Sequence, residues 1–140
     1  MRKFTLIALL AAVSTVLLAA CGEDEDKEGL TKDCPAAPAA MTGSTALPGS
    51  FPTPTAFVFT GIKKDGPSTV ASGYLNGSLT HAHQSFAKAV KNAPGYDVTK
   101  EEQDPADSEV NFEGAGNSGQ VKMNQDCRDR TTVTITIRPA

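Results

Sequence analysis

The chain has 140 residues, enough for one domain, and 39% of them are hydrophobic. Its 13 basic residues are outnumbered by 16 acidic ones, which gives a formal net charge of −3 at pH 7. An acidic chain without a basic cluster argues against nucleic acid as a partner. It also argues against electrostatic docking onto anionic lipid.

The first 20 residues have the pattern of a signal peptide. Arg2 and Lys3 supply positive charge, and an uncharged apolar run over 4–20 follows, which is short for a membrane span. The run closes with Leu18-Ala19-Ala20-Cys21. These four residues resemble the lipobox of bacterial lipoproteins. In that family the cysteine thiol is joined to a diacylglycerol, a peptidase cuts just before it, and the new amino group is often acylated.

The resemblance implies a lipoprotein held on the extracytoplasmic face of a cell membrane, outer or inner, through Cys21. Residues 1–20 would be removed as the signal peptide. Each buried methylene of an acyl chain contributes ~0.8 kcal/mol, so two chains give durable membrane attachment. An ordinary secretory signal peptide that happens to contain a cysteine is the alternative.

Residues 21–54 are expected to be the lipidated N-terminus and a linker. The acidic run "GEDEDKE" over 22–28 predicts a solvated spacer. The stretch "CPAAPAAMTGSTALPGSFPTP" over 34–54 is rich in Pro and Ala, which discourages both helix and sheet. We predict a semi-extended linker, of which the part near Phe51 can lie against the domain.

With Cys21 lipidated, Cys34 and Cys127 remain. Export places them in an oxidising compartment, where an even pair is normally bridged, so we predict a disulfide between them. On the chain-entropy account, closing a loop of this length contributes about 4 to 5 kcal/mol to stability. Two free thiols are the alternative, although neither cysteine lies in a C-x-x-C motif or beside a histidine.

From residue 55 the apolar residues recur with period two, which predicts β-strands. The first strand, over 56–64, places Phe57 and Phe59 on one face and Ile62 on the other. The turn residues "DGP" separate it from a second strand, over 68–75, and the pair is expected to be antiparallel.

A helix is predicted from Ser78, as its N-cap, to about residue 93, where Pro94-Gly95 ends it. Its apolar residues have the i, i+3, i+4, i+7 spacing of one buried face. They are Leu79, Ala82, Phe86, Ala89, Val90 and Ala93.

Four further strands are predicted over 96–103, 108–114, 119–125 and 131–139, separated by turn residues. Their clean alternation of apolar and polar residues is typical of a sheet buried on one face only. The element order β-β-α-β-β-β-β predicts an α+β domain over 55–140. In it, one helix packs on the apolar face of an antiparallel sheet of about six strands.

No catalytic or metal-binding pattern stands out in the sequence. His81 and His83 are two residues apart on the predicted helix, cannot chelate one metal together, and are expected to be exposed. The glycine-rich stretch "EGAGNSGQ" over 113–120 leads into a strand, so it predicts a hairpin and no phosphate loop. The carboxylates of Glu101 and Glu102 are expected to be solvated. We therefore predict no cofactor and no enzymatic activity.

The remaining candidate is the polar face of the sheet, opposite the helix. It consists of Glu109, Asn111, Glu113, Gln120, Lys122, Asn124, Thr132, Thr134 and Thr136. Such a face can bind an envelope protein or a cell-wall glycan. We therefore predict a lipid-anchored binding or modulating module. The alternatives are a carrier of a lipid or other apolar ligand between sheet and helix and, less favoured, an envelope hydrolase.

Overall fold

The computed structural model of the protein describes residues 33–140. The predictions for the signal peptide, for Cys21 and for the acidic run over 22–28 lie outside these residues. Within the described part of the chain, no helix is both long enough and apolar enough to cross a membrane.

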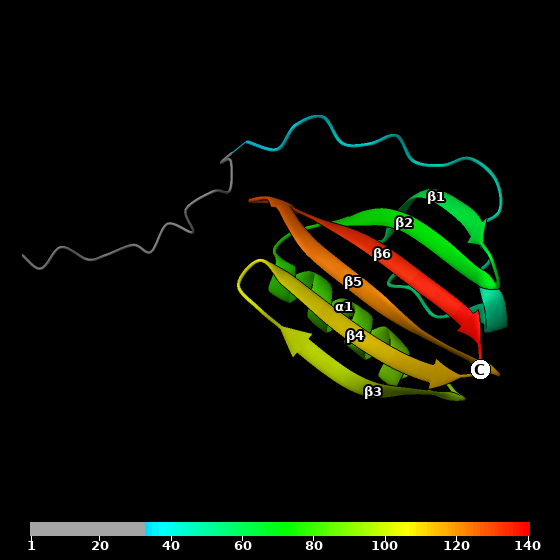
Figure 1. The fold of residues 1–140 in the computed structure, drawn as a ribbon. Coiled ribbons are helices and arrows are strands. Elements are labelled where there is room, and N and C mark those ends of the chain that lie inside the picture. The colour runs from blue at the N-terminus through cyan, green and yellow to red at the C-terminus, as the bar shows by residue number, and fades with distance from the viewer. Residues whose placement is uncertain (1–32) are drawn as a thin grey trace, which may run out of the picture.

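The described chain forms one six-stranded antiparallel sheet with one helix against it, so the predicted α+β fold is confirmed (Figure 1). The strands lie in the order β1-β2-β6-β5-β4-β3. The elements are the 3-10 turn η1 (Pro48–Ser50), β1 (Val58–Asp65), β2 (Ser68–Asn76), α1 (Leu79–Lys91), β3 (Tyr96–Gln103), β4 (Asp107–Gly114), β5 (Asn117–Cys127) and β6 (Arg130–Pro139).

Period-two alternation in the sequence becomes rows of apolar side chains across the sheet. In one row, Val110 of β4 pairs with Val121 of β5, which pairs with Ile135 of β6, which in turn pairs with Ala71 of β2. All four residues are completely buried. A shift of one residue in any of these pairings would move a strand's apolar set to the solvent side, so burial of this face fixes the register.

The helix begins where the sequence predicts. The Ser78 hydroxyl accepts a hydrogen bond from the His81 N–H at 3.3 Å. A second N–H of the first turn, that of Leu79, donates to Gln125 Oε1 at 2.6 Å, which ties the start of α1 to β5. The buried face consists of Leu79, Ala82, Phe86, Ala87 and Val90. Ala89 and Ala93, which the spacing assigns to this face, are only half-buried at its margin.

One strand differs from the predicted alternation. In β1, Phe59 pairs with Gly73 and Ile62 pairs with Ala71, and a bulge lies between Phe59 and Gly61. A bulge places two residues opposite one, so the side chains beyond it change faces. Ile62 therefore packs against the core on the same side as Phe59. The prediction that it lies on the opposite face was wrong.

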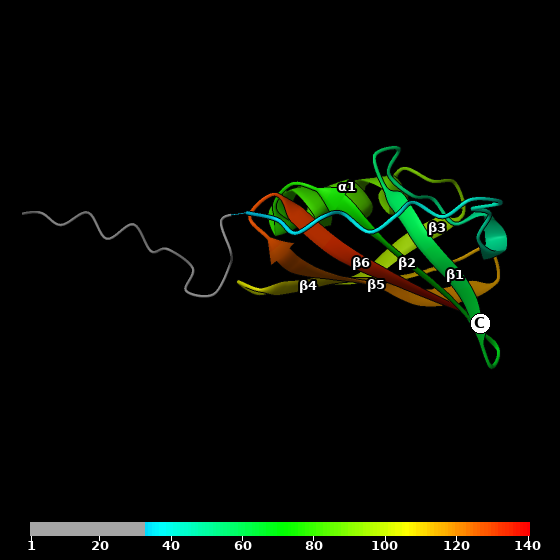
Figure 2. The ribbon, with the colours of Figure 1, turned by 90° about the horizontal axis from the view of Figure 1, so that it is seen from above.

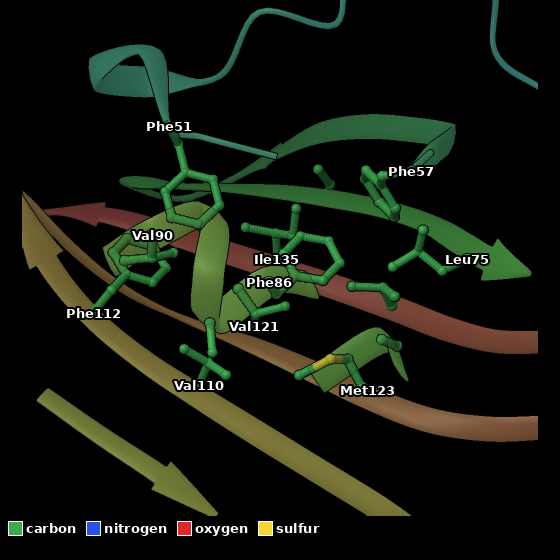
Figure 3. Packing of buried hydrophobic residues seen from close by; sticks show 14 of the residues in the cluster. Phe51, Phe57, Leu75, Phe86, Val90, Val110, Phe112, Val121, Met123 and Ile135 are labelled. Carbon is green, nitrogen blue, oxygen red and sulfur yellow. The ribbon is translucent and has the colours of Figure 1, made fainter. Parts of the chain in front are cut away.

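The helix packs mainly over β3, β4 and β5, so another part of the chain completes the core (Figure 2). We call residues 34–57 the N-terminal segment. Phe51 of this segment lies 4.3 Å from Phe112 and 5.7 Å from Tyr96 between ring centroids, and Phe57 lies 5.3 Å from Phe86 (Figure 3). The Phe51–Tyr96 and Phe57–Phe86 pairs are edge-on and the Phe51–Phe112 pair is tilted, and aromatic pairs of these kinds add to the free energy gained by burial alone. The last part of the predicted linker, over 47–54, is thus packed onto the domain near Phe51, as expected, whereas most residues over 33–46 are exposed.

Candidate binding face

The nine predicted face residues all lie on β4, β5 and β6, where they alternate with the buried residues of these strands. They therefore point to the side of the sheet opposite α1, which we call the outer face; Figure 2 shows α1 on the other side. The strand pairings set them in rows. One row is Glu109, Lys122 and Thr134, a second is Asn111, Gln120 and Thr136, and Asn124 pairs with Thr132. Glu113 pairs with Ser118 at the end of the β4–β5 hairpin. The period-two pattern of the sequence therefore predicts correctly that these residues share one face of the sheet.

Polar side chains on the outer face hold one another. Gln120 Nε2 donates to Glu109 Oε2 at 2.8 Å and to Asn111 Oδ1 at 3.4 Å. Lys122 Nζ lies 3.5 Å from Glu109 Oε1 and 4.0 Å from Asp107 Oδ2. These contacts limit the rotamers of the side chains, so a partner would have less side-chain entropy to remove on binding.

Charge is distributed unevenly over the outer face. Carboxylates gather over β3 and β4, where Asp97 is directly opposite Glu113 and Glu102 is directly opposite Glu109. Like charges opposite one another destabilise a sheet, although Lys100 Nζ, 2.6 Å from Glu102 Oε1, offsets part of this repulsion. Toward β6 the face becomes neutral and consists of threonines. A polar partner would therefore meet an acidic margin beside an uncharged strip.

A surface pocket of about 500 Å³ lies at the end of the β4–β5 hairpin, at the acidic margin. Its lining includes Asp97, Glu113, Asn117 and Ser118. The hairpin turn itself is confirmed, with Ala115 and Gly116 both at positive φ (48° and 72°), as a two-residue turn of the primed type requires. Glu113 and Ser118 are thereby held side by side at the rim of the outer face.

His83 is less exposed than its sequence position indicates. Its side chain is 12% exposed, with Nδ1 3.2 Å from Ser108 Oγ and Nε2 3.4 Å from Glu101 Oε1. The prediction of an exposed histidine was therefore wrong for His83, because β3 and β4 bring Glu101 and Ser108 against the helix. His81, by contrast, is exposed as predicted.

Ser108, His83 and Glu101 are the residue types of a serine–histidine–carboxylate relay. Ser108 is only 2% exposed, and its hydroxyl lies 3.9 Å from Met123 Sδ inside the protein. A nucleophile must reach a substrate carbonyl, which this burial prevents. In this conformation the three residues join the helix to the sheet.

Glu101 is the centre of this junction. Its Oε2 accepts a hydrogen bond from Lys91 Nζ at 2.6 Å, while Oε1 faces His83. The Lys91 hydrogen bond, together with the charges of Lys91 and His83, lowers the pKa of Glu101 against the opposing effect of partial burial. The sequence predicts only that Glu101 is solvated. It does not predict that Glu101 joins the helix to the sheet, because Lys91 and His83 lie ten or more positions before it in the sequence.

The predicted disulfide is present. Cys34 and Cys127 are bonded, with their Cα atoms 5.2 Å apart. Beside it, Arg130 is buried, donates to the Pro35 carbonyl at 2.9 Å and contacts Asp126 Oδ2 at 2.7 and 2.8 Å. The sequence places Arg130 among the turn residues between the predicted strands over 119–125 and 131–139, and its burial is not predictable from that position. A buried arginine is stable here because its donors are satisfied.

Within residues 33–140, no group of three or more His, Cys, Asp or Glu side chains is placed to hold a metal ion. The space between helix and sheet is filled by completely buried side chains such as Phe86, Val121 and Ile135. No protein-family model matches the chain, and neither does any curated protein or solved structure.

We predict that Glu101→Gln lowers the free energy of unfolding at pH 7 by less than about 1 kcal/mol, as for other partly exposed ion pairs. Because the pKa of Glu101 is lowered in the folded state, its contribution is present above about pH 4 and is lost as the pH falls through that lowered pKa. Urea unfolding at several pH values measures this difference. Glu113→Gln, an exposed carboxylate on the outer face, is the control and should not reproduce it. A Glu101→Gln difference that persists unchanged at pH 2 would contradict this role.

Proposed function

We propose that the protein is a lipid-anchored, extracytoplasmic bacterial lipoprotein that binds an envelope protein or a cell-wall component through its outer face. It acts by binding and not by catalysis. The lipobox-like residues Leu18-Ala19-Ala20-Cys21 suggest the anchor. The observation that carries the binding proposal is the outer face, a broad polar surface whose side chains are held by one another and left uncovered by α1.

The disulfide supports this location in two ways. A bridged pair is typical of an oxidising compartment outside the cytoplasm. The bridge also fixes the chain at Cys34, which follows Cys21 by 13 positions. A flexible tether of that length has an r.m.s. span of about 20 Å and a limit of ~45 Å. The domain would therefore work close to the membrane surface.

The anchor predicts that Cys21→Ala releases the protein from membranes. Without the thiol there is no site for the diacylglycerol, and the apolar area that holds the protein on the bilayer is lost. Membrane sedimentation of cells that express each form measures the partition, and mass spectrometry of the mature N-terminus measures the acyl chains. Cys34→Ala, which removes a cysteine of the domain, should stay with the membrane. Equal membrane partition of Cys21→Ala and the unchanged protein would contradict the anchor.

The outer face predicts that Thr134→Arg, which places a bulky cation in the neutral strip, abolishes partner binding. Photo-crosslinking from position 134 in intact cells detects a protein partner, and co-sedimentation with purified peptidoglycan detects a wall glycan. A crosslinker at Lys88, exposed on the opposite side of the molecule, is the matched control. Capture that is equal from positions 134 and 88, together with glycan binding that Thr134→Arg leaves unchanged, would contradict the proposal.

A further inference from the structure

The two edge strands of the sheet differ in how well they are covered. At the β3 edge, Lys91 and Thr80 of α1 bond to Glu101 and Gln103. The β3 strand also carries a row of exposed charged residues, which protects an edge from pairing with other chains. At the β1 edge, the helix makes little contact, and Val58, Phe59 and Ile62 remain half-exposed.

The N-terminal segment passes the β1 edge without forming a strand there (Figures 1 and 2). It is fixed by the disulfide at Cys34 and by the burial of Leu47. Between these points, one backbone hydrogen bond joins it to β1, from the Met41 N–H to the Phe59 carbonyl at 2.7 Å. Prolines in this stretch lack the N–H that a ladder needs. The outward-facing backbone of β1 is therefore left largely unpaired by the described chain.

A pocket lies at the same edge, between the N-terminal segment and β1. Its volume is about 430 Å³, which falls in the range of about 300–1,000 Å³ typical of ligand sites. Met41, Pro54, Phe57, Val58 and Phe59 contribute apolar walls. Thr45, Thr53 and Thr55 line the rest of the pocket, so its wall is partly apolar and partly polar. A pocket with apolar walls on one side, next to largely unpaired strand backbone, has the features of a strand-addition site, in which backbone bonds give affinity and a side-chain pocket gives specificity.

Charge defines the chemistry of the occupant. Lys63 of β1 is exposed and has no ion-pair partner within residues 33–140. Phe59 and Lys63 are four positions apart on β1, but because of the bulge their partners on β2, Gly73 and Val70, are only three positions apart. A strand added on the other side of β1 that follows the same bulge would therefore present an apolar residue to the pocket and an acidic residue to Lys63, three positions apart.

We propose that β1 is a strand-addition site for an extended segment of a partner protein with an apolar residue and an Asp or Glu three positions from it. The added strand displaces Met41 from the Phe59 carbonyl and pairs with the backbone of β1, while its apolar side chain packs against the pocket walls that remain, Pro54, Phe57 and Phe59. The backbone and pocket of this site lie at the β1 edge, away from the nine outer-face residues on β4, β5 and β6, although Lys63 points to the same side of the sheet as Thr136. It does not depend on the lipid anchor or on the proposed function.

The test selects a phage-displayed library of random octapeptides on the full chain in detergent micelles. Enriched peptides should share the apolar–acidic spacing and lack proline. A synthetic copy of the most enriched octapeptide should slow hydrogen–deuterium exchange over 58–65 and leave 131–137 unchanged. Lys63→Glu should weaken its binding roughly fivefold, and a peptide with Lys in place of the acid should regain binding to that variant. Lys88→Glu, on the exposed side of the helix, is the control and should bind normally.

Three results would overturn the proposal. The first is that no peptide is enriched, or that the enriched peptides lack the acidic residue. The second is protection over 131–137 of the outer face instead of 58–65. The third is a concentration-dependent dimer with protected β1, seen by light scattering, which would assign this edge to a second copy of the chain.

Discussion

The disulfide between Cys34 and Cys127 is the constraint on which the arrangement of the domain depends. It holds the start of the N-terminal segment at the β5–β6 turn, where Arg130 also binds the Pro35 carbonyl. The chain then returns to bury Leu47 and Phe51 in the core. A bridge across 93 residues mainly limits the unfolded chain, and it also keeps this proline-rich segment near the surface it must cover.

With the N-terminal segment held in this way, two parts of the chain cover the apolar face of the sheet. The helix packs over β3, β4 and β5, while Phe51 and Phe57 of the N-terminal segment complete the core (Figure 3). The described chain leaves the outer face uncovered by α1 and covers the β1 edge only in part. The outer face is broad and polar, whereas the β1 edge is narrow, partly apolar and has unpaired backbone. Surfaces of such different chemistry suit different partners, which is why we assign them separate roles.

The strands and the helix were predictable because their apolar residues recur with periods of 2 and 3.6. Val133, Ile135 and Ile137 alternate with threonines, so the outer face could also be predicted. The bulge that turns Ile62 toward the core could not be predicted, because the amino-acid composition of β1 does not indicate it. The burial of His83 and of Arg130 arises from neighbours distant in sequence, and periodicity contains no information about such neighbours. The position of β6 between β2 and β5 likewise depends on long-range pairing.

The stability of the protein without its disulfide tests the central claim most directly. In a double variant, Cys34→Ser with Cys127→Ser, equilibrium unfolding in guanidinium should show a free energy about 4 to 5 kcal/mol below that of the bridged protein. Hydrogen exchange over 47–51 should accelerate in the same variant, because the segment loses its fixed start. A loss below about 1 kcal/mol with unchanged protection over 47–51 would contradict the account, since the segment would then be held without the bridge.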